Sequence, residues 1–110
     1  MSINAIGGEQ VLMCRVTYEP GAVIPEHNHP HSEQLMWVVE GDVTLTVEGQ
    51  TQTLRGGDVA VVNKGLNHHL STVEGCLFIE ALAPVPVDHV PVPERDLVLG
   101  EGGGALHVER

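Results

Sequence analysis

The sequence predicts an all-β fold, either a sandwich or a barrel, from two observations. Several short segments alternate apolar and polar residues with a period of two, which is typical of half-buried strands. Turn signals containing glycine or proline recur about every 8–12 residues, the spacing of antiparallel sandwiches and barrels. No window keeps a helical period over three turns. Strands that alternate with helices are therefore not expected.

The clearest expected strand covers residues 43–48. Val43, Leu45 and Val47 leave one face of it, while two threonines and a glutamate leave the other. Turns at residues 40–42 and 48–50 bound this strand, and both resemble hairpin turns. The other expected strands cover residues 10–18, 34–39, 50–55, 58–62, 68–72 and 76–82.

The chain changes in character after residue 82. Residues 83–93 hold four prolines, which cannot donate to a sheet ladder, so an extended edge segment or a strap is expected there. At roughly 100–200 residues per domain, the chain predicts one domain, residues 1–99. The glycine-rich residues 100–110 are expected to form a flexible tail.

The charge and the cysteines narrow the class of protein. Fifteen acidic against five basic residues leave a net charge of −10, which disfavours binding to nucleic acid or to anionic membranes. The start of the chain lacks a basic stretch followed by an apolar one, so a cytoplasmic location is expected. Cys14 and Cys76 form no CxxC motif and are expected to be buried thiols.

Two closely spaced histidines indicate a metal site. His27 and His29 are two residues apart, so on a strand both imidazoles leave the same face. A divalent cation satisfies two such rings. A third ligand must come from a neighbouring strand, which begins with Glu33 or Gln34. Histidine-rich sites with one oxygen ligand suit iron, manganese, nickel, zinc or copper.

A further histidine ligand is expected from the segment after the Lys64-Gly65 turn. Either His68 or His69 can supply it, because both follow that turn at the start of an expected strand. Neighbouring residues on a strand face opposite ways, so only one of the two points at the metal.

Two spaced motifs resemble those of the cupin family. The first runs from Gly21 through His27 and His29, then four residues to Gln34 and six more to Gly41. The second runs from Gly57 through residues 63–65, with asparagine in the usual proline place, to His68. The resemblance implies a cupin-type double-stranded β-helix, or jelly-roll barrel, that holds one divalent transition metal.

The motif spacing favours one ligand set. The motif places six residues between this ligand and Gly41, which selects Gln34 rather than Glu33, and the spacing of the second motif selects His68 over His69. The resemblance thus implies metal binding by His27, His29, Gln34 and His68. Such a neutral shell leaves the full charge of the metal acting on a bound oxygen.

Residues beside the metal are expected to act on a substrate. Glu80 lies in the middle of an otherwise apolar strand, where a carboxylate is costly unless it faces water or a cation, and it is the candidate general acid or base. Candidate substrate contacts are Arg15, His31, Met36 and Phe78. Surface positions for Arg15 and His31 are the alternatives.

The run His-Asn-His-Pro-His-Ser-Glu-Gln and the chain length resemble the small cupins that act on unsaturated uronates. Those proteins carry an acidic residue on a late strand, which Glu80 matches, followed by a proline and an arginine. Here Pro84 is present without the arginine. The resemblance implies an enzyme that stabilises an enolate of a small oxygen-rich substrate, by isomerase, tautomerase or lyase chemistry. A dioxygenase and a non-catalytic binding module are the alternatives.

The chain is also expected to form a homodimer. The apolar first strand, residues 11–18, and the proline-rich strap are the surfaces that the sequence offers for it.

Overall fold

The computed structural model describes residues 2–86, which form strands and no helix. This confirms the all-β prediction. None of these residues lies in a helix with the length and hydropathy of a membrane span. The strands are β1 (Ser2–Gly7), β2 (Leu12–Tyr18), β3 (Val23–His27), β4 (Glu33–Val47), β5 (Gln50–Arg55), β6 (Val59–Val62), β7 (His68–Ser71) and β8 (Cys76–Ala83).

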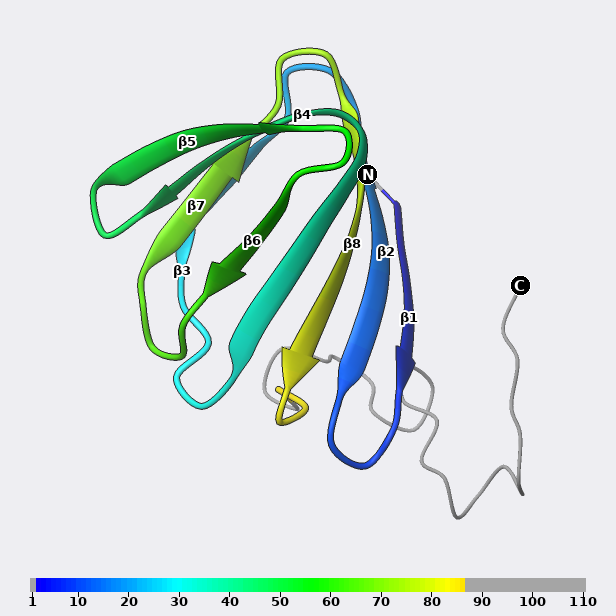
Figure 1. Ribbon diagram of the computed structural model, residues 1–110, viewed down its shortest axis with the longest axis vertical. Helices are drawn as coiled ribbons and strands as arrows, with labels where there is room; N and C mark the ends of the chain where they lie inside the picture. Colours follow the sequence, from blue (N-terminus) through cyan, green and yellow to red (C-terminus); the bar gives the residue numbers. More distant parts are fainter. Residues whose placement is uncertain (1, 87–110) are drawn as a thin grey trace.

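The strands form a curled antiparallel arrangement in which β4 takes part in two sheets (Figure 1). The first half of β4 pairs with β6 and β8, and β8 continues to β2 and β1. The second half of β4 pairs with β5 and β7, and β7 continues to β3. This is the double-stranded jelly roll that the sequence predicts.

Gly41 allows β4 to pass from one sheet to the other. The register of β4 against β8 shifts between Val38 and Glu40, which marks a bulge, and Gly41 follows at φ 83°. A Cβ at Gly41 would lie 2.8 Å from the Cα of Cys76 and would collide with the carbonyl oxygen of Gly75. The hairpin expected at residues 40–42 is therefore a bulged bend inside one long strand.

Two strands were not expected from the sequence. β1 is an edge strand that pairs only with β2, so its residues show little alternation. β3 contains Pro25, and its ladder to β7 is irregular between Ile24 and His27. Of the expected strap, only residues up to 86 are described. The tail at residues 100–110 lies outside the described residues.

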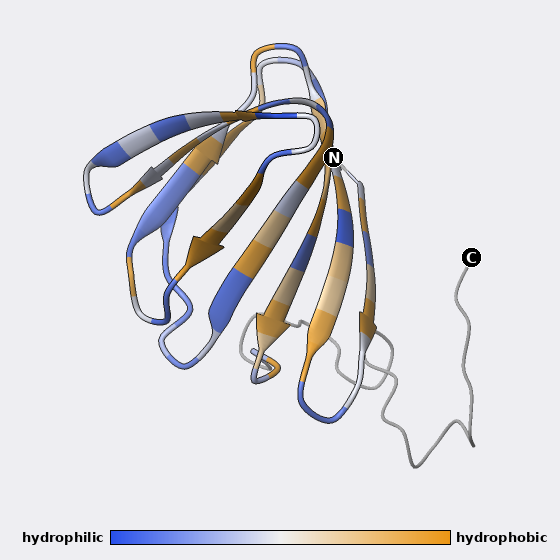
Figure 2. Ribbon diagram, viewed as in Figure 1, coloured by the Kyte–Doolittle hydropathy of each residue, from blue (hydrophilic) through white to orange (hydrophobic). Residues whose placement is uncertain are grey.

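The core fills the space between the two sheets. Tyr18 and Phe78 pack against one another in it, with ring centroids 5.8 Å apart and ring planes tilted by 52°. Cys14 and Cys76 are buried thiols, as expected. Figure 2 shows the alternation of hydropathy along β5, in contrast to the continuously apolar β6. The buried apolar side chains are Leu12, Cys14, Val16, Tyr18, Met36, Val38, Val43, Leu45, Val62, Leu70, Cys76, Phe78 and Leu82.

Candidate metal centre

Three histidines from two segments of the chain converge inside the fold. His27 ends β3 and His68 begins β7, and the antiparallel pairing of these strands places the two residues opposite one another. His29 follows two residues after His27. One ligand atom from each histidine lies within 4.8 Å of the others, a spacing that suits a shared metal ion. The ring centroids of His27 and His68 are 4.3 Å apart.

Backbone carbonyl groups orient two of these rings. Nδ1 of His27 lies 2.8 Å from the carbonyl oxygen of Pro25, and Nδ1 of His68 lies 3.0 Å from that of Leu66. A carbonyl oxygen only accepts, so each Nδ1 carries the proton and donates it. This makes Nε2 the ligating nitrogen of each ring, and such outer contacts fix the orientation of metal-binding histidines.

Gln34 supplies a buried oxygen that fits a cation. Its side chain is 3% exposed, and its Nε2 donates a hydrogen bond of 2.5 Å to Oε2 of Glu80. When Glu80 is ionised, that bond fixes the amide, because a carboxylate oxygen accepts and an amide oxygen cannot donate. The Oε1 atom of Gln34 is buried and has no hydrogen-bond partner within residues 2–86. Glu33, on the opposite face, is exposed.

The donor set is chemically consistent with a transition metal. Three imidazole nitrogens and an unsatisfied amide oxygen form a neutral, mostly nitrogen shell, which suits iron, manganese, nickel, zinc or copper. The residues present therefore fit the metal that the sequence motifs imply. The choice of Gln34 as fourth ligand stays a prediction.

Glu80 lies on the inner face of β8, and its side chain is half-buried. Its register partners are Cys14 on β2 and Met36 on β4. Burial raises the pKa of Glu80 to about 7, and the hydrogen bond from Gln34 opposes that rise. Burial, with a contribution from the charge of Glu80, raises the pKa of Cys14 to about 12. Cys14 is therefore a neutral thiol near neutral pH and is not an activated nucleophile.

The predicted substrate contacts lie in different surroundings. Met36 and Phe78 are buried on the inner faces of β4 and β8. Arg15 alternates with the buried Cys14 and is exposed on the outer face of β2, so the structure does not bring it to the histidines. His31 is exposed in the turn after Pro30, beside a hollow of about 460 Å³ that Lys64 also lines.

One contact near the histidines escaped the sequence analysis. Nδ2 of Asn28 donates a hydrogen bond of 2.9 Å to Oδ1 of Asn67. These asparagines are 39 positions apart in the chain, and neither stands at a ligand position of the two motifs. Only the pairing of β3 with β7 brings them together.

Comparisons with known proteins agree with this architecture. The TcmJ protein of the tetracenomycin polyketide synthase, from Streptomyces glaucescens, is 26% identical over 110 residues, covering 92% of this chain and 74% of that protein. The putative germin-like protein 9-2 of Oryza sativa subsp. japonica is 31% identical over 96 residues, covering 81% of this chain and 45% of that protein. The chain thus spans less than half of that second relative.

Solved structures show the same fold. The structure of KdgF from Halomonas sp. superposes with a TM-score of 0.70 at 26% identity, covering 74% of this chain and 77% of that one. An RmlC-like cupin from Shewanella frigidimarina superposes with a TM-score of 0.69 at 25% identity, covering 79% of this chain and 86% of that one. A family model of the cupin domain matches residues 14–79. The chain belongs to the cupin family.

Proposed function

We propose that this protein is a metal-dependent enzyme that transfers a proton on a small, oxygen-rich organic substrate, by isomerase, tautomerase or lyase chemistry. The convergence of His27, His29 and His68 within 4.8 Å carries the proposal. Gln34 completes the proposed ligand set with its buried oxygen. A divalent transition metal supplies a Lewis acid that stabilises negative charge as it develops on the substrate oxygens.

Glu80 is the proposed acid or base. Its Oε2 atom accepts a hydrogen bond from the amide of Gln34. We therefore assign Oε1 as the atom that receives and returns the proton. The buried side chains of Met36 and Phe78 lie beside this carboxylate, Met36 as its register partner on β4 and Phe78 two residues before it on β8. A carboxylate in such surroundings transfers protons to a bound substrate rather than to bulk solvent.

The comparisons support this class of substrate without identifying a member. The chain is similar to KdgF and to TcmJ, and its histidine run resembles that of cupins acting on unsaturated uronates. We therefore propose that the substrate offers two neighbouring oxygens, such as a keto-enol or hydroxy-acid edge.

Metal analysis of purified variants tests the ligand set. The wild type and Glu33→Ala are expected to retain one metal ion per chain, because Glu33 is exposed on the other face of β4. Gln34→Ala and His68→Ala are expected to lose it wholly or in part. Loss of metal from Glu33→Ala, with retention in Gln34→Ala, would overturn the assignment.

A substrate screen tests the reaction. Metal-loaded protein is incubated with small keto acids, enols and unsaturated uronates, both in air and without oxygen. Product formation without oxygen, lost in Glu80→Gln at unchanged metal content, is expected. Product that depends on oxygen uptake would point to a dioxygenase instead. Tight metal binding without any product would favour a non-catalytic binding module.

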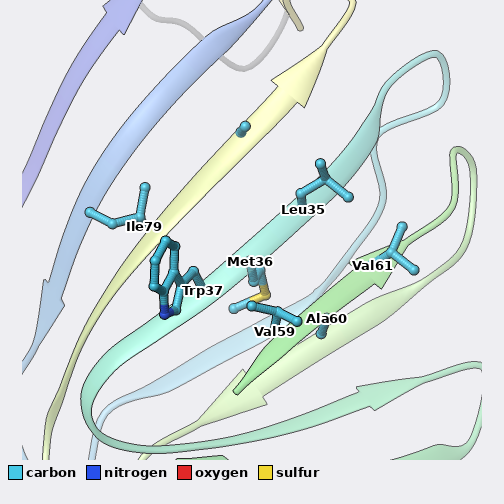
Figure 3. A pocket seen from close by; sticks show the side chains of 8 residues that line it. Leu35, Met36, Trp37, Val59, Ala60, Val61 and Ile79 are labelled. Atoms are coloured by element: carbon cyan, nitrogen blue, oxygen red, sulfur yellow. The ribbon is translucent and has the colours of Figure 1, made fainter. Parts of the chain in front are cut away.

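We further propose that two copies of the chain pair through the outer face of the sheet formed by β2, β8, β4 and β6. In this sheet Leu35 lies opposite Val61 and Ala81, and the next outward row places Trp37 opposite Val59 and Ile79. The side chain of Trp37 is 57% exposed and that of Val59 is 69% exposed. These rows line a shallow apolar hollow of about 520 Å³ (Figure 3).

A second copy is the occupant that this face favours. The projecting Trp37 and the hollow beside it lie on the same face, which is what a two-fold interface requires. The face continues to Met13 on β2 and Val39 on β4, which are 50% and 45% exposed. Contiguous exposed apolar side chains of this kind mark interaction surfaces. The exposed residues on the outer side of β2 are Met13, Arg15 and Thr17, so Met13 is the residue of this strand that extends the apolar face.

Sedimentation or light scattering tests the pairing. The wild type is expected to be dimeric, and added salt should strengthen the dimer because it screens the repulsion between two chains of charge −10. Trp37→Glu should give monomers. The matched control is Val73→Glu, at a residue 76% exposed in a turn away from this face. A monomeric wild type would refute the proposal.

A further inference from the structure

We infer that Glu48, Asn67 and Asn28 form a positioning tie that holds the three histidines at the spacing a metal requires. The inference rests on the proposed metal centre. It concerns residues that surround the ligands, because none of the three belongs to the ligand set. The tie begins at the hairpin between β4 and β5 and ends between the first two histidines.

The first link of the tie joins Glu48 to Asn67. The backbone N–H of Glu48 donates to the carbonyl oxygen of Asn67 at 3.1 Å, and Oε1 of Glu48 accepts from the backbone N–H of Asn67 at 3.0 Å. Two bonds in opposite directions fix both polar groups of the Asn67 backbone. Asn67 directly precedes His68, so this link sets where β7 begins.

The second link joins Asn67 to Asn28 through their side chains, at 2.9 Å. Asn28 stands between His27 and His29. Asn28 is the chain neighbour of both histidines, so a hydrogen bond that holds its side chain restrains the backbone that carries both imidazoles. One bond therefore couples two ligands of one segment to the third ligand of another.

Glu48 occupies its position against local preference. It is the one residue other than glycine with a positive φ, 47°, among residues 2–86, and it is followed by Gly49 at φ 79°. A two-residue hairpin with both central φ angles positive favours asparagine followed by glycine. Glutamate in this conformation is strained, because its Cβ comes too close to the following carbonyl oxygen. Unlike the shorter asparagine, it reaches the N–H of Asn67, and strain of this kind typically marks a functional constraint.

This arrangement predicts opposite effects on stability and on metal affinity. Glu48→Asn relieves the hairpin, so the metal-free protein should melt at the wild-type temperature or above it. The same change removes the bond to Asn67 and should weaken metal binding. For Asn28→Ala and Asn67→Ala we expect about tenfold weaker binding, the lower end of the range for changes beside metal ligands. The hydrogen bond between these side chains is exposed, so the metal-free protein should lose little stability.

The experiment measures Co²⁺ affinity by competition with a coloured chelator, the visible spectrum of the Co²⁺-loaded protein, and melting of the metal-free protein. The variants are Glu48→Asn, Asn28→Ala, Asn67→Ala and the double alanine variant. Asn67→Asp keeps an acceptor for Asn28 and should restore the affinity. Thr51→Val is the matched control, because it removes a side-chain hydrogen bond of 2.8 Å to Thr46 on the same sheet, outside the tie.

The results separate this inference from the proposed function. Weaker Co²⁺ binding with an altered spectrum in each single variant, no further loss in the double variant, and an unchanged Thr51→Val support the tie. Wild-type affinity and spectrum in both asparagine variants would overturn the tie and leave the metal centre standing. A wild type that binds no Co²⁺ would overturn the metal centre itself.

Discussion

Replacement of Gly41 by alanine tests the bend that makes β4 part of two sheets. A side chain at φ 83° costs about 1–2 kcal/mol from the left-handed backbone alone. The added Cβ would also lie 2.8 Å from the Cα of Cys76 and collide with the carbonyl oxygen of Gly75. Both neighbours are backbone atoms of a paired strand and cannot rotate away. Overpacking of this kind adds about 1–3 kcal/mol.

The matched control is Gly21→Ala. Gly21 has nearly the same φ, 82°, and nothing lies within 4 Å of an added Cβ. The free energy of unfolding of Gly21→Ala should therefore fall only by the cost of the left-handed backbone, about 1–2 kcal/mol. Gly41→Ala should lose more free energy of unfolding than Gly21→Ala, because β4 passes close to residues 75 and 76. We expect this difference to be about 2 kcal/mol.

The free energy of unfolding of both variants is measured in urea, with far-ultraviolet circular dichroism as the signal. In melting experiments, at about 4 °C per kcal/mol, Gly41→Ala should melt roughly 12–16 °C below the wild type and Gly21→Ala roughly 4–8 °C below it. Equal losses in the two variants would refute the reasoning, because they would mean that β4 does not pass against residues 75 and 76 at this bend.

Three further predictions concern the carboxylate of Asp42, the core and the metal. Two backbone N–H groups and the Thr72 hydroxyl donate to the Asp42 carboxylate and lower its pKa, so the folded protein binds fewer protons than the unfolded one. The stability that Asp42 contributes is therefore present above its unfolded pKa and is lost as the pH falls through its folded pKa. In urea titrations at several pH values, the free energy of unfolding should fall less steeply with acid in Asp42→Asn than in the wild type. Phe78→Ala removes a ring that is 1% exposed and should cost about 3–5 kcal/mol, measured by chemical unfolding. A chelator should lower the melting temperature of the wild type, because the metal stabilises only the folded chain, and should leave that of His68→Ala unchanged.

The candidate site divides into parts that local sequence predicts and parts that it does not. His27, His29 and His68 are predicted from motif spacing, because the spacing reflects strand alternation and turn length, which are local. The convergence of His27 with His68 depends on the register of β3 against β7, across 41 positions of the chain. The bond between Gln34 and Glu80 similarly joins residues 46 positions apart.

Alternation of apolar and polar residues predicts the strands and their inward faces, because side chains of a strand alternate whatever the partner strand is. It does not predict that Arg15 lies on the outer face of β2, away from the histidines. Nor does it predict that Trp37 lies among other exposed apolar residues on the outer face of the sheet. Those outcomes depend on pairing between strands distant in the chain, and on the bend at Gly41, where a turn signal proved to be a bulge. Local pattern determined the elements and the ligand types of this protein. Tertiary pairing decided which of those residues meet, because a contact between distant segments leaves no periodic trace in either one.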